Sequence, residues 1–222
     1  MEDLLSGAAD AIDAAQTIGN GKPGMLFTGG KDAMVMLHIA RERCDTVPPL
    51  LVIDTGVQFD AIYNFREEIA EEWGLELDVR RNDEAIEEIR DGKGYAWDGP
   101  KTDACCGRLK IDVMSDFIAD GFDPLVVGRR SADIGHDIPV YDEDYREPVP
   151  HDRVHPLANW SDAHVAAYIT KHQIPLPSLY DEGYNHTDCV PCTTVGEEGD
   201  DWSGASQEAK AQLDNLRGMG YM

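Results

Sequence analysis

Four of the five cysteines fall in two close pairs. Cys105 and Cys106 are adjacent, and two residues separate Cys189 from Cys192. In a reducing compartment, such pairs favour a metal or cluster site over disulfides. Structural zinc usually takes two C-x-x-C pairs, whereas four thiolates are the standard ligands of an iron–sulfur cluster. The alternative is that Cys105 and Cys106 are buried apolar residues and that Cys189 and Cys192 form a redox pair.

A glycine-rich segment, residues 28–32 (TGGKD), is a candidate anion site, and we call it the anion loop. It follows a short apolar run and precedes an amphipathic segment. It should therefore lead into the start of a helix, where free backbone N–H groups and the helix dipole attract negative charge. Gly29 and Gly30 let the backbone approach a phosphate or sulfate closely, and Lys31 adds a positive charge. The loop lacks the GxxxxGK[ST] pattern of common nucleotide hydrolases, and by itself it is also compatible with a plain turn.

The elements that would position these residues alternate between short apolar strands and amphipathic helices. This pattern is typical of an α/β fold with a mostly parallel, twisted sheet, helices on both faces, and a ligand at the carboxyl ends of the strands.

Residues 91–104 are predicted to be a loop and residues 131–153 to be irregular. No repeat or linker divides the chain, so we expect one domain over residues 1–194 and an acidic, partly helical tail over residues 195–222. The expected strands are 25–27, 50–53, 75–79 and 125–127, and the expected helices are near 4–15, 34–39, 60–73, 85–89, 106–119 and 161–174.

The charge balance is strongly acidic, with 43 Asp and Glu against 19 Lys and Arg and a net charge of −24. This sign opposes nonspecific binding to a phosphate backbone, so a broad nucleic-acid interface is excluded. Because the acids are spread along the chain, we expect a halophilic protein whose self-repulsion is screened in a salt-rich cytoplasm; the alternative is an ordinary acidic soluble protein.

No apolar run reaches the length of a membrane span, and the first residues do not resemble a signal peptide, so a cytoplasmic location is expected.

Taken together, the motifs resemble the adenylyl-sulfate (APS) and phosphoadenylyl-sulfate (PAPS) reductase family, within the PP-loop ATP pyrophosphatases. The matching segments follow the family's order over about residues 24–194. They are FTGGKD at 27–32, VIDTGVQF at 52–59, Cys105-Cys106 with Lys110, Gly128-Arg129-Arg130, PLANWS at 156–161, and LYDEGY at 179–184 before Cys189-Val190-Pro191-Cys192. The resemblance implies an adenine nucleotide α-hydrolase-like (Rossmann-like) fold that binds APS, PAPS or ATP.

The resemblance also implies individual roles. The paired cysteines imply a [4Fe-4S] cluster, as in the branch of the family associated with APS. Lys110 matches a catalytic lysine beside both cluster and sulfate, and Arg130 matches an arginine that binds the substrate anion, as a guanidinium can do bidentately. The sulfate or phosphate end would be held by Thr28, Gly29, Gly30, Lys31 and Asp32, and the adenosine by Ile53, Asp54, Thr55 and Gly56.

The chain departs from the family pattern at three places. Thr28 and Ala33 replace the two serines of the usual SGGKDS loop. His136 stands where a second anion-binding arginine is expected, which predicts a weaker or pH-dependent hold on the substrate. No cysteine follows Cys192, so the family's nucleophilic cysteine has no counterpart. The fifth cysteine, Cys44, is expected about 18 Å along its helix from the anion loop, which is too far for attack.

Three further histidines lie near these motifs: His151, His155 and His186, the last of them three residues before Cys189. The resemblance gives them no ligand role. We therefore expect exposed loop histidines, which are the commoner case.

The leading functional hypothesis is the reduction of APS or PAPS to sulfite and an adenosine phosphate. In that reaction a thiolate attacks sulfur, and a thioredoxin-like protein resolves the resulting thiosulfonate. Since this chain lacks the thiolate, a second protein or an external thiol would have to supply it. One alternative is an ATP pyrophosphatase in sulfur transfer, as in DNA phosphorothioation, with a partner that brings the target. The other is a nucleotide or sulfate sensor without turnover.

Overall fold

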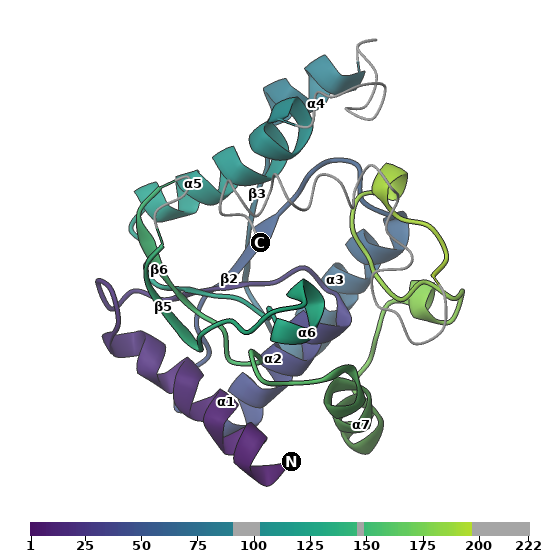
Figure 1. Ribbon diagram of the computed structural model, residues 1–222. Coiled ribbons are helices and arrows are strands. Elements are labelled where there is room, and N and C mark those ends of the chain that lie inside the picture. The colour runs from purple at the N-terminus through teal and green to yellow at the C-terminus, as the bar shows by residue number, and fades with distance from the viewer. Residues whose placement is uncertain (91–102, 146–148, 197–222) are drawn as a thin grey trace.

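A six-stranded sheet forms the centre of the molecule within residues 1–90, 103–145 and 149–196, the part that the computed structural model describes (Figure 1). The strand order is β3-β2-β1-β4-β6-β5. The pairs of neighbouring strands are parallel except β5–β6, which is antiparallel. The predicted mostly parallel α/β fold is therefore confirmed. The strands are β1 (Gly24–Leu26), β2 (Leu50–Ile53), β3 (Leu77–Arg80), β4 (Leu125–Val126), β5 (Tyr141–Tyr145) and β6 (His151–Val154).

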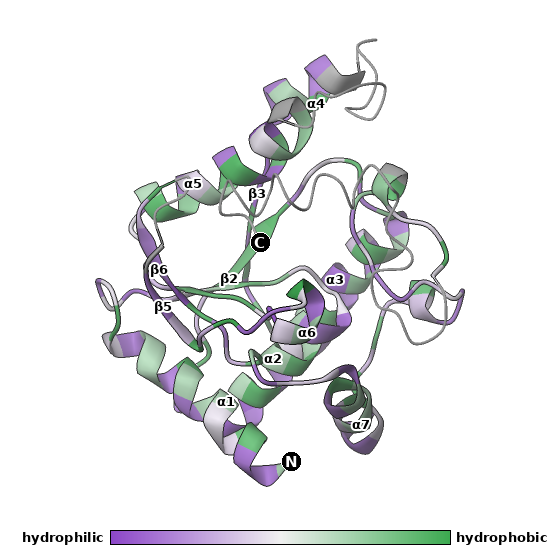
Figure 2. Cartoon of the chain, viewed as in Figure 1, coloured by the Kyte–Doolittle hydropathy of each residue, from purple (hydrophilic) through white to green (hydrophobic). Residues whose placement is uncertain are grey.

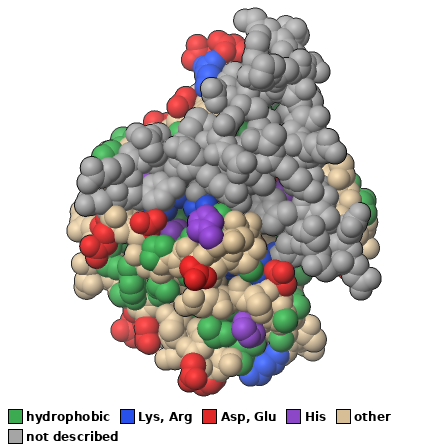
Figure 3. All heavy atoms as spheres, viewed as in Figure 1, with side chains coloured by type: hydrophobic (Ala, Val, Ile, Leu, Met, Phe, Trp, Pro, Cys, Tyr) green, Lys and Arg blue, Asp and Glu red, His purple; other side chains and the backbone are tan. Residues whose placement is uncertain are grey.

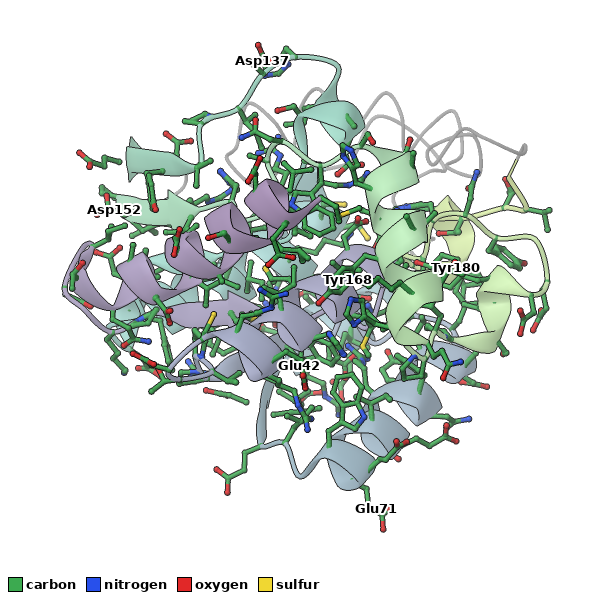
Figure 4. The ribbon with its side chains drawn as sticks, turned by 90° about the horizontal axis from the view of Figure 1, so that it is seen from below. Glu42, Glu71, Asp137, Asp152, Tyr168 and Tyr180 are labelled. Carbon is green, nitrogen blue, oxygen red and sulfur yellow. The ribbon has the colours of Figure 1, made fainter. Side chains whose placement is uncertain are left out.

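Helices cover both faces of the sheet. Because side chains alternate along a strand, Leu50 and Val52 of β2 pack on one face and Leu51 packs on the other. Figure 2 shows β2 as an apolar strand inside helices that carry polar outer surfaces. The first face is covered by α1 (Glu2–Ala14), α2 (Lys31–Arg43), α3 (Asp60–Trp73) and α7 (Asp162–His172), and the second by α5 (Asp112–Ala119). Tyr168 of α7 lies against α2, with its hydroxyl oxygen 3.0 Å from Nδ1 of His38 (Figure 4).

The strand order reverses at β1, and this reversal places the candidate site. The sheet extends through β2 and β3 on one side of β1, and through β4 and β6 on the other. The loops that leave β1, β2 and β4 therefore diverge at the carboxyl edge, where open α/β sheets bind ligands. A Cβ added to Gly128, after β4, would lie 3.4 Å from the backbone of Asp32, so two of these loops are in direct contact.

The segment predicted to be irregular, residues 131–153, is instead partly regular. It contains the short helix α6 (Ser131–Ile134) and the strands β5 and β6. The prediction was wrong because β6 has polar residues at buried positions. Arg153 is 1% exposed, and its Nε donates a hydrogen bond of 2.8 Å to Nε2 of His151, so the usual apolar alternation is missing.

The remaining helices differ from the expected ones mainly at their ends. α4 spans Asp83–Arg90, and the helix expected over 106–119 begins as a π-helical segment, η3 (Asp103–Ile111), before α5. Short 3₁₀ turns are η1 (Ala15–Thr17), η4 (Ser178–Tyr180) and η5 (Val190–Cys192). Residues 91–102 of the predicted loop and residues 197–222 of the predicted tail lie outside the described residues.

Acidic side chains lie over the surface of the described part. They are scattered over the face shown in Figure 3, and Glu71 and Asp137 point away from the body of the molecule in Figure 4. None of the helices in the described ranges is long and apolar enough to cross a membrane.

Two of the three histidines expected on exposed loops are buried. His151 is 3% exposed and His155 is 1% exposed. His151 begins β6 and His155 follows it, and β6 lies inside the sheet between β4 and β5. Nδ1 of His155 lies 3.0 Å from the carbonyl oxygen of Pro139, and that contact places the ring proton on Nδ1. Burial lowers the pKa of His155 to about 4, so the ring is neutral at pH 7.

His155 should make stability depend on pH. Its pKa is about 4 in the folded protein against 6.5 when unperturbed, so its contribution is fully present above pH 6.5 and is lost as the pH falls toward 4. His155→Gln keeps an N–H for the Pro139 carbonyl but does not titrate. Between pH 7 and pH 4.5, its unfolding free energy should fall less than that of the wild type, by about 2–3 kcal/mol. Urea denaturation measures this, with His136→Gln, at an exposed position, as the control. The same pH dependence in His155→Gln and wild type would contradict the assignment.

Candidate functional site

The anion loop turns the chain from β1 into α2. Gly29 has φ +82°, a left-handed conformation that residues with a side chain rarely adopt. The N–H of Gly30 donates to Oγ1 of Thr28 over 3.2 Å, and Nζ of Lys31 lies 2.8 Å from the carboxylate of Asp32. Backbone donors and a lysine therefore gather at the N-terminal end of α2, which is the arrangement that binds anions.

Tyr180 is a residue at this loop that the sequence did not reveal. Its hydroxyl group accepts a hydrogen bond of 3.0 Å from the backbone N–H of Lys31. Burial raises the pKa of Tyr180, so the hydroxyl stays protonated. Tyr180 belongs to the LYDEGY segment, but a tyrosine 149 residues from the loop carries no local signal of this contact.

The residues after β2 form a tight turn beside the anion loop. The carboxylate of Asp54 accepts hydrogen bonds from the N–H of Gly56 (2.7 Å) and from the hydroxyl of Tyr63 (2.8 Å). Gly56 has φ +69°, again in the left-handed region. Asp54 and Gly56 therefore shape this turn, while Ile53 and Thr55 face the cavity beside it.

One cavity of about 270 Å³ brings together most of the predicted site residues. It lies at the carboxyl edge of the sheet, between the anion loop and two segments that are far apart in the sequence. Gly29, Asp54, Gly56, Arg130 and His136 are not among its lining residues. The predicted residues that line it are Thr28, Gly30, Lys31, Asp32, Ile53, Thr55, Lys110, Cys105, Cys106, Cys189 and Cys192.

The four paired cysteines lie around this cavity. Cys105 and Cys106 are in η3, and Cys189 and Cys192 flank η5; Oγ1 of Thr55 lies 3.2 Å from Sγ of Cys189. A hydrogen bond with Cys105 lowers the pKa of Cys106 to about 7 against the effect of burial. Burial raises the pKa of Cys189. Within the described ranges, no group of three or more His, Cys, Asp or Glu side chains is arranged to hold a metal ion.

Lys110 stands among these cysteines and is paired with an aspartate. Its Nζ donates to both carboxylate oxygens of Asp188, each over 2.7 Å, and both residues line the cavity. Against the opposing effect of burial, the charge of Lys110 lowers the pKa of Asp188. The charge of Lys110 also helps to lower the pKa of the Cys106 thiol. Asp188 carries one local signal in the sequence, its position next to Cys189.

Arg130 does not reach the cavity. Its side chain is fully buried, and three carboxylates surround its guanidinium: Asp32 at 2.9 Å, Asp133 at 2.5 Å and Asp162 at 2.6 Å. These carboxylates belong to the starts of α2 and α7 and to α6, so Arg130 joins three helices. Its neighbour Arg129 lines the cavity instead.

His136 is exposed and lies away from the cavity, whereas His186 lines it. Of the three histidines expected on exposed loops, His186 is thus the one placed beside the site, and within the described ranges it belongs to no group of three or more potential metal ligands.

Comparisons with known proteins identify the family of this chain. The sequence model of the phosphoadenosine phosphosulfate reductase domain matches residues 22–195. The adenosine 5′-phosphosulfate reductase of Mesorhizobium japonicum is 29% identical over 196 residues, which cover 84% of this chain and 74% of that protein. The sulfate adenylyltransferase subunit 2 of Azospirillum brasilense is 31% identical over 189 residues; the match spans 72% of this chain and 60% of that subunit.

Solved structures give the same picture of the fold. The phosphoadenylyl-sulfate reductase from Candida auris, in a phosphate complex, superposes with a TM-score of 0.69 at 19% identity and covers 86% of this chain and 94% of that one. The FMN adenylyltransferase of Candida glabrata superposes with a TM-score of 0.65 at 16% identity, over 96% of this chain and 73% of that one. The match over residues 22–195 includes the anion loop and both cysteine pairs. The chain therefore belongs to the phosphoadenosine phosphosulfate reductase domain family.

Proposed function

We propose that this chain is an iron–sulfur APS or PAPS reductase homologue that reduces the activated sulfate of an adenine nucleotide to sulfite. One observation carries the proposal: the anion loop, the four paired cysteines and Lys110 line the same cavity. Residues 1–194 would form the nucleotide-binding domain. The acidic surface suits a salt-rich cytoplasm, where ions screen its self-repulsion.

In the proposed reaction a thiolate attacks the sulfur atom of the bound sulfate. The S–O bond to the nucleotide phosphate breaks, and its electron pair leaves on the phosphate oxygen. A second thiol then attacks the sulfur of the donor thiol in the thiosulfonate, which forms a disulfide and releases sulfite. The anion loop would bind one anionic group of the nucleotide, and Lys110 would stabilise charge on the sulfate oxygens.

The cysteine arrangement fits a [4Fe-4S] cluster. Three of the four thiol residues, Cys105, Cys106 and Cys189, are 4–7% exposed, and the Lys110 charge nearby favours a thiolate. Four thiolates around one cavity are the donor set that a [4Fe-4S] cluster takes. Bound there, the cluster would connect η3 to the segment around η5 and place its charge beside Lys110.

Cys44, the cysteine outside the two pairs, is not placed to supply the nucleophilic thiol. Cys44 follows α2 at the end opposite the anion loop, and its Sγ lies 3.6 Å from the carbonyl oxygen of Ala9. Burial, with the charge of Asp13, raises the pKa of Cys44 to about 12, so little thiolate forms at neutral pH. We therefore infer a thioredoxin-like protein or a small thiol as the donor.

A second candidate function is ATP cleavage at the same loop. It is supported by the 31% identity to a sulfate adenylyltransferase subunit 2 and by the fold shared with FMN adenylyltransferases. The deciding assay gives the protein APS, PAPS or ATP with a thioredoxin-like donor present. Sulfite from APS or PAPS supports the reductase, pyrophosphate from ATP supports the second candidate, and binding without either product indicates a sensor.

The cluster proposal predicts iron and sulfide in the isolated protein. Anaerobically purified protein should be brown, with roughly four iron and four sulfide per chain. Cys105→Ser and Cys189→Ser should each lose both, because each removes a ligand, while Cys44→Ser should keep them. Iron and acid-labile sulfide analysis measures this. A colourless wild type that carries one zinc per chain would refute the cluster.

Lys31 should contribute to nucleotide binding. Lys31→Ala removes a charge-assisted contact at the anion loop, so the affinity for APS or ATP should fall by about 1.5–3 kcal/mol while the fold persists. Lys171→Ala, at an exposed position at the end of α7, is the matched control. Calorimetry should show the loss in the first variant alone; equal affinity in Lys31→Ala and wild type would rule out the placement.

The chain should not form a thiosulfonate by itself. We expect no covalent label when purified protein is incubated with sulfur-labelled APS in the absence of thiol, because Cys44 lies far from the loop and its thiol is protonated. Mass spectrometry of the intact chain detects the label. Addition of a thioredoxin-like donor should release sulfite equally from wild type and Cys44→Ser. Stoichiometric label on Cys44 would show that the distance argument is wrong.

A further inference from the structure

Arg66 is a buried arginine that packs directly against the anion loop. It lies in α3 and is 4% exposed. A Cβ built on Gly29 would lie 3.0 Å from Cγ and 3.5 Å from Cδ of Arg66, so the missing side chain at Gly29 is what lets the arginine approach. Arg66 lies outside the sequence motifs of the site.

A hydrogen bond connects Arg66 to a residue that lines the cavity. Its Nη2 donates to Oε1 of Gln58 over 2.9 Å, and Gln58 lines the cavity and forms a β-bridge with Cys189. Its other terminal nitrogen, Nη1, is buried and has no hydrogen-bond partner. In the described part of the chain no carboxylate forms an ion pair with Arg66, although the charge of Asp54 acts on it.

This arrangement contrasts with that of three other cations near the site. Lys31 is paired with Asp32, Lys110 with Asp188, and Arg130 with three carboxylates. The guanidinium carbon of Arg66 lies instead 5.1 Å from the centre of the Tyr63 ring. A charge buried without an ion pair is costly, and an arginine does not escape the cost by losing its proton. The site therefore carries a buried positive charge beside the loop whose backbone donors favour an anion.

We propose that Arg66 is the counter-charge for the anionic group bound at the anion loop, with Gln58 holding its guanidinium in position. The inference rests on the proposed function in taking that group to be the phosphate or sulfate of a nucleotide. Like Arg130, Arg66 is not among the residues that line the cavity, so it would act on the anion through the loop, as a buried positive charge. Its Nη1 is the guanidinium nitrogen that has no hydrogen-bond partner.

The test compares the empty and the anion-bound protein. Arg66→Met removes the charge and keeps an apolar stem of similar length. Affinity for APS, ATP and inorganic pyrophosphate should fall about ten- to a hundredfold, while affinity for uncharged adenosine should not change. Without ligand, Arg66→Met should melt at the same or a higher temperature than wild type, because it removes an unpaired buried charge. Arg41→Met, at an exposed arginine in the last turn of α2, is the control and should bind all four ligands as wild type does.

The outcomes separate this inference from the proposed function. Unchanged anion affinity in Arg66→Met overturns the inference and leaves the proposed function standing. A wild type that binds pyrophosphate through Arg66 but neither nucleotide overturns the proposed function and supports the inference. A wild type that binds no anion overturns both. Arg66→Gln, uncharged but still able to bond Gln58, is measured alongside; if neither variant folds without ligand, the charge is needed by the empty fold and the inference fails.

Discussion

The arrangement of the site depends on the three carboxylates that surround Arg130. A guanidinium with no exposed surface must be paired, and removal of one partner from such a group is strongly destabilising. Asp32 of this set is also the last residue of the anion loop, so the requirement to neutralise Arg130 fixes the loop relative to α6 and α7. Burial and the charge of Asp32 raise the pKa of Asp133 to about 6, which shows how closely the carboxylates are packed.

The carboxylates around the site also determine which of its cations can bind a ligand directly. In a chain with a net charge of −24, Lys31 and Lys110 each lie within 2.8 Å of a carboxylate oxygen, so an incoming anion must compete with or join an existing pair. The backbone N–H groups of the anion loop have no carboxylate with which the anion must compete, and neither has a cation without an ion pair. An incoming anion therefore gains more from the backbone N–H groups at the start of α2 than the number of basic side chains around the site would suggest.

Local pattern predicted much of the fold, and it failed where burial involves polar residues. The bounds of α3 and the strand β2 follow from apolar periodicity and the left-handed Gly74 that ends the helix. The strand β6 could not be recognised, because His151 and Arg153 satisfy each other inside the protein. The motif resemblance named several residues that line the cavity, but it could not show that Arg129 lines it while carboxylates such as Asp162 hold Arg130 away from it. Asp188, Tyr180 and Arg66 make their contacts across the fold, and of the three only Asp188 has a local signal, its position next to Cys189.

Contacts within the protein hold each of the two cysteine pairs at the cavity. Cys189 forms a β-bridge with Gln58, and the N–H of Val190 donates to the carbonyl oxygen of Val57 over 2.9 Å, which fixes one pair to the turn after β2. The other pair is held where Cys105 packs with Ala85 and other residues of α4 and η3. Since α4 and this turn both follow strands of the same sheet half, β2 and β3 set the distance between the pairs. The sheet therefore places both cysteine pairs and Lys110 around the same cavity.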